Sequence, residues 1–121
     1  MSFKLSKEEM RQYQENIDSL RTTTEAFEQA KKNKEDPLPA LVEFLSTLET
    51  AREFCEMIAE DWRCEFEDRS DSWKENDRGS EVDSIIEEWE SVELDEPDLD
   101  DPLNLELEDY AQLLEDLPTE L

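Results

Sequence analysis

Carboxylates are the side chains that could do chemistry in this chain, and they are spread unevenly along it. The 121 residues include 12 Lys and Arg, 37 Asp and Glu and no His, which gives a formal charge of −25 at pH 7. No Lys or Arg follows Arg78, although 17 acidic residues do. Like charges crowded on one surface oppose folding, so a chain that needs charge only for solubility would mix the two signs. The segment after Arg78 therefore indicates a surface whose negative charge is itself functional.

Other kinds of reactive site have little support in the sequence. Without His, the chain lacks the commonest general base and the commonest metal ligand, and a single Gly excludes a glycine-rich phosphate loop. A calcium loop of the EF-hand type that began at Glu96 would place Asp101 where that loop needs Gly. Cys55 and Cys64 share one expected helix and lie about 13 Å apart along its axis, too far for a disulfide. We therefore predict a protein that is not an enzyme, holds no metal or cofactor and keeps two free thiols.

The charge also restricts the possible partners. A formal charge of −25 opposes binding to nucleic acid or to an anionic membrane and favours a basic protein. No apolar run approaches the length that crosses a bilayer, and the opening residues MSFKLSKEEM do not resemble a secretory signal. We expect a cytoplasmic protein, in the host cell if a phage encodes it, that binds neither nucleic acid nor membrane directly.

The apolar residues predict that helices carry these carboxylates. Over residues 37–73, large apolar side chains alternate at spacings of four and three, which is the pattern of one helix face. The series contains Leu41, Leu45, Leu48, Cys55, Ala59, Trp62, Phe66 and Trp73, and it is widened by Val42, Phe44, Ala51, Phe54 and Ile58. We expect a helix over 38–77 that continues, straight or bent, through residues 70–72 and ends near Gly79. A break at 70–72 is the alternative.

Three further helices are predicted around this one. A capping box of Ser6 and Glu9 begins the first, over 6–33. Ser80 caps a third over 80–94, and a short acidic helix over 102–117 follows an acidic, Pro-containing linker. The short Pro-containing connection between the first two helices predicts a long antiparallel hairpin in an all-α fold. We expect a helical body over 1–94, a tail over 95–121, and a homodimer through the two long helices.

The expected partner-binding surface combines acidic residues of the second helix with those that follow Gly79. Its members are Glu60, Asp61, Glu65, Glu67, Asp68, Asp71, Glu81, Asp83, Glu87, Glu88, Glu90, Glu93, Asp95, Glu96, Asp98, Asp100 and Asp101. Trp73, Tyr110 and Leu114 are candidates for apolar contacts with the partner. The favoured interpretation of the last helix is that it covers an apolar face of the body, and the alternative is that it folds on a partner.

Small size, extreme acidity, the lack of a metal site and an expected helical fold resemble the acidic DNA-mimic inhibitors of phages and mobile elements. The resemblance implies a carboxylate-rich surface that occupies the basic groove of a nuclease, a CRISPR effector or a nucleoid protein, as anti-restriction and anti-CRISPR proteins do. The alternative is an acidic adapter, antitoxin or chaperone that binds a basic partner through an apolar helical interface. Charge reversal at residues such as Glu87 would then matter less than Leu114→Ala or Trp73→Ala.

Overall fold

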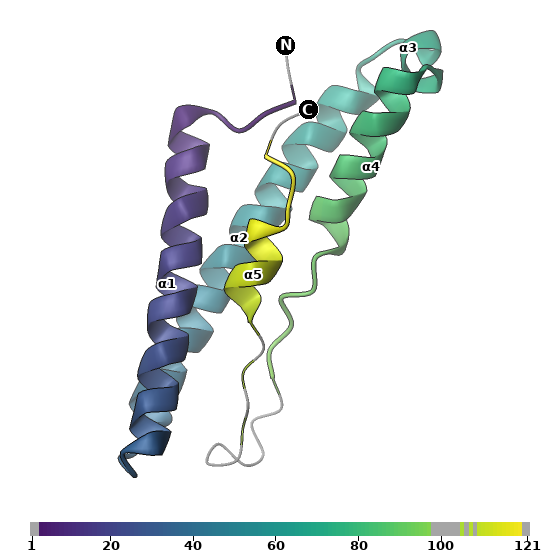
Figure 1. Ribbon diagram of the computed structural model, residues 1–121. Helices are drawn as coiled ribbons and strands as arrows, with labels where there is room; N and C mark the ends of the chain where they lie inside the picture. Colours follow the sequence, from purple (N-terminus) through teal and green to yellow (C-terminus); the bar gives the residue numbers. More distant parts are fainter. Residues whose placement is uncertain (1–2, 98–104, 106, 108, 120–121) are drawn as a thin grey trace.

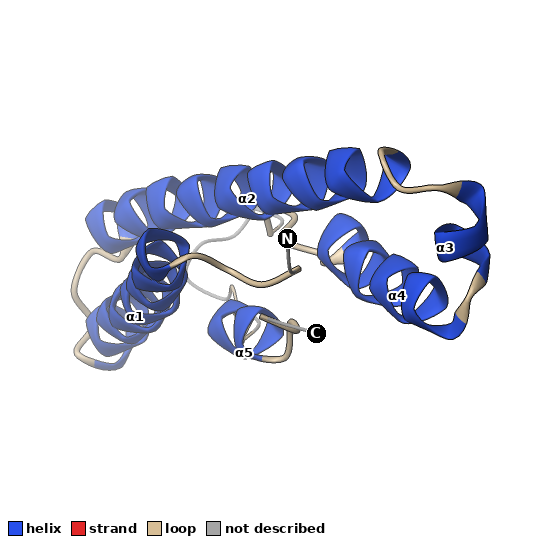
Figure 2. Cartoon of the chain, turned by 90° about the horizontal axis from the view of Figure 1, so that it is seen from above, coloured by secondary structure: helices blue, strands red, loops and turns tan. Residues whose placement is uncertain are grey.

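The computed structural model describes residues 3–97, 105, 107 and 109–119, and within them it contains five α-helices and no β-strand (Figure 1). The helices are α1 (Lys7–Lys32), α2 (Leu38–Glu67), α3 (Asp71–Glu75), α4 (Asp77–Ser91) and α5 (Tyr110–Glu115). α1 and α2 form an antiparallel pair, and α1, α5 and α4 all lie on one side of α2 (Figure 2). The predicted all-α fold, with its long hairpin and short C-terminal helix, is confirmed.

The hairpin begins and turns where the sequence indicates. The Ser6 side chain accepts a hydrogen bond from the Glu9 N–H at 3.1 Å, and the Ser6 N–H donates to the Glu9 carboxylate at 2.8 Å, so the capping box is confirmed. Lys34 turns the chain after α1 with a φ of 58°. Asp36 then accepts a hydrogen bond from the Leu38 N–H at 3.0 Å as α2 begins.

The expectation that the second helix continues to residue 77 is wrong. α2 ends at Glu67, and the separate short helix α3 follows it. The Ser70 side chain accepts a hydrogen bond from the Trp73 N–H at 3.3 Å, which caps α3. α2 has therefore ended before Ser70, and the Ser70 side chain favours the start of a new helix, because Ser side chains bind backbone N–H groups at helix starts. Trp73 packs against the core although it lies beyond the break. Its spacing from the apolar residues of α2 therefore favoured a continuous helix in the sequence.

The predicted start of the third helix, at Ser80, is also wrong. α4 begins at Asp77, because the Asn76 side chain accepts a hydrogen bond from the Gly79 N–H at 2.8 Å. Gly79 is therefore inside the first turn of α4 and does not end the preceding helix. A Cβ atom at this position would lie 2.3 Å from the Trp73 carbonyl oxygen, so the α3–α4 corner requires a residue without a side chain.

The tail helix is shorter than predicted, and it joins the core. Helical structure begins at Tyr110, whereas Leu105 and Leu107 are not helical; residues 102–104, 106 and 108 lie outside the described residues. The segment packs between α1 and α4, where the Tyr13 hydroxyl donates to the Leu114 carbonyl at 2.6 Å. One cluster of buried apolar residues includes side chains from α1, α2, α4 and α5. The apolar side of the hairpin is thus covered by α4 and α5 of the same chain. A dimer is no longer needed to bury it, and the homodimer stays a prediction.

Candidate partner-binding surface

The side of α2 that faces away from the other helices carries a series of exposed carboxylates along most of its length. In Figure 2, α2 lies along one edge of the molecule with the other helices on its opposite side. Between Glu43 and Asp68 the row is about 38 Å long, at about 1.5 Å of rise per residue. We call it the α2 face, and its members are Glu43, Glu49, Glu53, Glu56, Glu60, Asp61, Glu67 and Asp68.

The carboxylates of the α2 face are almost free of internal counter-charges. Among the described residues, only Glu67 of this set forms an ion pair, with Lys74 at 3.5 Å. No Lys or Arg occupies an exposed position of α2, because Arg52 and Arg63 are half-buried along its flank. The face therefore carries one carboxylate per about 5 Å, compared with one phosphate per about 3.4 Å along each strand of duplex DNA.

Half of the α2 face was missed in the sequence. Glu43, Glu49, Glu53 and Glu56 were not predicted as part of the surface, because the uneven charge of the sequence points to the region after Arg78. The signal that identifies them is their position opposite the apolar series of the same helix. The three arginines of residues 52–69 made this side of the helix look less acidic in the sequence, because a sequence gives the number of arginines and not the direction in which they point.

Four of the predicted surface residues form ion pairs with cations of the same chain. Arg63 joins α2 to α4 through ion pairs to Asp83 and to Glu90, both at 2.7 Å. The hydrogen bond that Arg63 donates to Glu90 is the main cause of the raised pKa of Arg63. Burial opposes this rise, and the hydrogen bond that Arg63 donates to Asp83 adds to it. Glu65 pairs with Arg69 at 3.0 Å, and Glu67 pairs with Lys74 as described above. These four carboxylates contribute less to the external field than the sequence suggested, because Arg63, Arg69 and Lys74 together offset most of their charge.

The other predicted carboxylates lie on the surface of α2, α3 and α4 and on the segment that follows α4. Those that are exposed and have no ion pair within the described residues are Glu60, Asp61, Asp68, Asp71, Glu81, Glu87, Glu88, Glu93, Asp95 and Glu96. Asp98, Asp100 and Asp101 lie outside the described residues. The structure therefore gives the negative surface two parts, the α2 face and the outer side of α4.

The apolar contact residues proposed from the sequence are corrected. Tyr110 and Leu114 are 4% and 0% exposed, because they fill the space between the hairpin and α4, and they are not available to a partner. Trp73 is half-buried, with its ring 5.9 Å from that of Phe3. This outcome agrees with the favoured interpretation that the last helix covers the body.

Exposed apolar side chains lie instead on the α2 face itself. They are Leu38, Val42 and Met57, which are 49%, 66% and 41% exposed. Val42 had been assigned to the apolar series from its sequence position, and that assignment is wrong, since the adjacent Leu41 takes the buried position. The α2 face therefore offers apolar atoms between its carboxylates, which a phosphate backbone does not.

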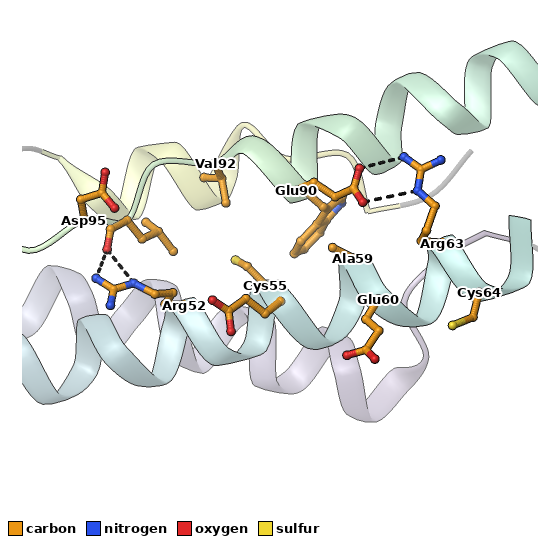
Figure 3. A pocket seen from close by; sticks show the side chains of 12 residues that line it. Arg52, Cys55, Ala59, Glu60, Arg63, Cys64, Glu90, Val92 and Asp95 are labelled. Atoms are coloured by element: carbon orange, nitrogen blue, oxygen red, sulfur yellow. Dashed lines mark hydrogen bonds and ion pairs between the residues drawn. The ribbon is translucent and has the colours of Figure 1, made fainter. Parts of the chain in front are cut away.

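Two grooves border the α2 face. The larger, of about 480 Å³, lies between α2 and the end of α4, with Cys55, Ala59 and Val92 in its wall (Figure 3). The second, of about 440 Å³, lies between α2 and α1 and includes Glu53 and Met57. Burial raises the pKa of the Cys55 thiol to about 12, whereas Cys64 is exposed, and both thiols are free as predicted.

Comparisons with known proteins identify no relative. No protein-family model matches the chain, and no match was found among curated proteins or among solved structures. Among the described helices, none has the length and apolar character needed to cross a membrane. The described residues also contain no group of three or more Cys, Asp or Glu side chains arranged to hold a metal ion.

Proposed function

We propose that this protein is a non-enzymatic, cytoplasmic inhibitor that binds the basic surface of a nucleic-acid-binding protein and excludes nucleic acid from it. The observation that carries the proposal is the α2 face, a straight row of carboxylates about 38 Å long with almost no internal counter-charge. The partner is a nuclease, a CRISPR effector or a nucleoid protein. Charge complementarity on this scale raises the association rate and makes binding sensitive to salt.

The geometry of the α2 face suits imitation of one strand more closely than imitation of a duplex. Its carboxylate spacing of about 5 Å is within a factor of two of the phosphate spacing along a single strand, whereas a duplex carries one charge per about 1.7 Å. A groove lined with Lys and Arg would release counterions when it received either ligand. The exposed side chains of Val42 and Met57 would add contacts that nucleic acid does not make.

The test is affinity capture with the tagged full-length chain at low and high salt, with identification of the captured proteins and competition by added DNA. The Glu49→Lys/Glu53→Lys variant reverses two charges of the α2 face. The Glu25→Lys/Glu28→Lys variant reverses two exposed charges of α1 and has the same net charge, so it is the matched control. We expect the α2 variant alone to lose a partner that DNA displaces, with helicity unchanged by circular dichroism. Equal capture by both variants at low salt would rule out the α2 face as the site.

A second function, an acidic adapter, antitoxin or chaperone with an apolar interface, has one specific observation in its favour. Val42 and Met57 are exposed at the surface of α2, where apolar side chains of that size contact a partner in many complexes. A Val42→Ser/Met57→Ser variant would then lose binding more completely than the charge-reversal variant, and binding would persist at high salt. Leu114→Ala no longer discriminates between the two functions, because that side chain is in the core.

A further inference from the structure

The groove between α2 and the end of α4, the α2–α4 groove, has an apolar floor. Cys55 and Ala59 form the α2 side of the floor, and Val92 and Leu94 form the other side (Figure 3). Its volume of about 480 Å³ lies within the range of sites that hold ligands. The floor can therefore receive apolar side chains from another molecule.

The charges around the α2–α4 groove favour a cationic occupant. Arg52 and Arg63 line it, but Arg52 donates from Nε to the Leu94 carbonyl at 3.1 Å, and Arg63 is held by its two α4 carboxylates. The remaining charged lining residues are Glu56 and Glu60 on the α2 side and Asp95 on the other, with Glu90 already paired to Arg63. Within the described residues those three form no ion pair. The four carboxylates and two arginines that line the groove leave it a net charge of −2, so the lining as a whole favours a cationic occupant.

We propose that the α2–α4 groove is the docking site for a basic amphipathic helix of the partner, which is an inference that rests on the proposed function. The apolar stripe of such a helix would lie on Ala59 and Val92. Lys or Arg on either side of the stripe would reach Glu60 on one side and Asp95 on the other, with their methylene groups on the apolar floor. Many DNA-binding proteins insert a helix into the major groove, so a basic helix suits the proposed class of partner.

The experiment measures binding of a fluorescent synthetic helix of Leu and Lys with one apolar stripe, and of a scrambled peptide with the same composition and no stripe. Binding is measured by anisotropy at low and at physiological salt. The variant Glu56→Gln/Glu60→Gln removes two charges beside the groove. The control variant Glu25→Gln/Glu28→Gln removes two exposed charges of α1, outside both the groove and the α2 face. A bulky maleimide on Cys64, which is exposed and lines the groove, provides an independent block.

We expect the striped peptide to bind. The Glu56→Gln/Glu60→Gln variant should reduce its affinity about tenfold, which is the scale of two exposed charge pairs. The control variant should reduce it less than about twofold. Alkylation of Cys64 and scrambling of the peptide should each weaken binding as well. Equal losses from the two variants, or equal affinity for the two peptides, would overturn the groove as docking site and leave the charge-based function intact. Failure of both peptides to bind at low salt would overturn both proposals.

Discussion

Gly79→Ala is the most direct test of the α3–α4 corner, because alanine normally stabilises a helix interior. In an ordinary helix this change raises the free energy of unfolding by about 1 kcal/mol. Here the added Cβ would lie 2.3 Å from the Trp73 carbonyl oxygen and 2.5 Å from that of Lys74. Both obstacles are backbone atoms, so α4 has to move away from α3, and overpacking of this kind costs about 1–3 kcal/mol.

Backbone cannot rotate aside as a side chain can, so we take the upper end of that range, about 3 kcal/mol. Set against the gain of about 1 kcal/mol from alanine, the free energy of unfolding should fall by about 2 kcal/mol. For a chain of this length the melting temperature should fall by about 8 °C, measured by circular dichroism. Ser80→Ala, at the next residue of the same turn, is the matched control and should be neutral or slightly stabilising.

Gly79→Asn separates close packing from the alternative that this glycine ends a helix. Asn tolerates the left-handed conformation of a helix end, so it would be better than Ala there. In this structure Gly79 does not have a positive φ, and Asn should be at least as destabilising as Ala. A Gly79→Ala protein as stable as the parent, or rescue by Asn, would refute the close approach of α4 to α3.

Three further predictions concern the core, a cap and the thiols. Leu114→Ala should lower the free energy of unfolding by about 2–5 kcal/mol in urea titrations, because Leu114 is fully buried, whereas a tail helix not packed on the body would leave it nearly unchanged. Asn76→Ala should cost about 1 kcal/mol, measured in the same titrations, by leaving the first turn of α4 uncapped, and Asn76→Ser should restore most of the loss. A maleimide should label Cys64 in the native protein and Cys55 only in denaturant. Burial raises the pKa of Cys55 to about 12, so the free energy of unfolding should fall as pH rises from about 9 toward 12. This fall should be smaller in Cys55→Ala.

The fold could be predicted from the sequence wherever local chemistry and long-range packing agree. The capping box at Ser6 and the apolar series from Leu41 to Phe66 describe α1 and most of α2, because each helix buries one regular stripe. The segment from Arg69 to Gly79 could not be predicted in this way. There the choice between a straight helix and a corner depends on the fit of Gly79 against the backbone of α3, which is a contact between two elements and is not visible as a spacing.

The positions of the exposed carboxylates differ from those expected from the sequence for a related reason. Net charge is additive along a sequence, but a surface potential depends on where each cation points. Arg63 lies in α2, yet it pairs with both Asp83 and Glu90 of α4 and offsets one of their two negative charges, so the region after Arg78 is less negative than its composition suggests. The upstream acids of α2, such as Glu49 and Glu53, gain importance because the arginines of that helix lie along its flank.

Under the proposed function, the α2 face would lower the stability of the free protein and strengthen its complex with a basic partner. Its carboxylates repel one another, and within the described residues only Glu67 is paired, so α2 is held in place by its buried side and not by charges on its exposed side. Salt screens that repulsion and therefore favours the folded free protein, while it also screens attraction to a basic partner. A partner that supplies cations relieves the same repulsion by binding. The residues that oppose folding are thus those that favour association, and this accounts for a surface row of acids on a helix whose other side is packed by three elements.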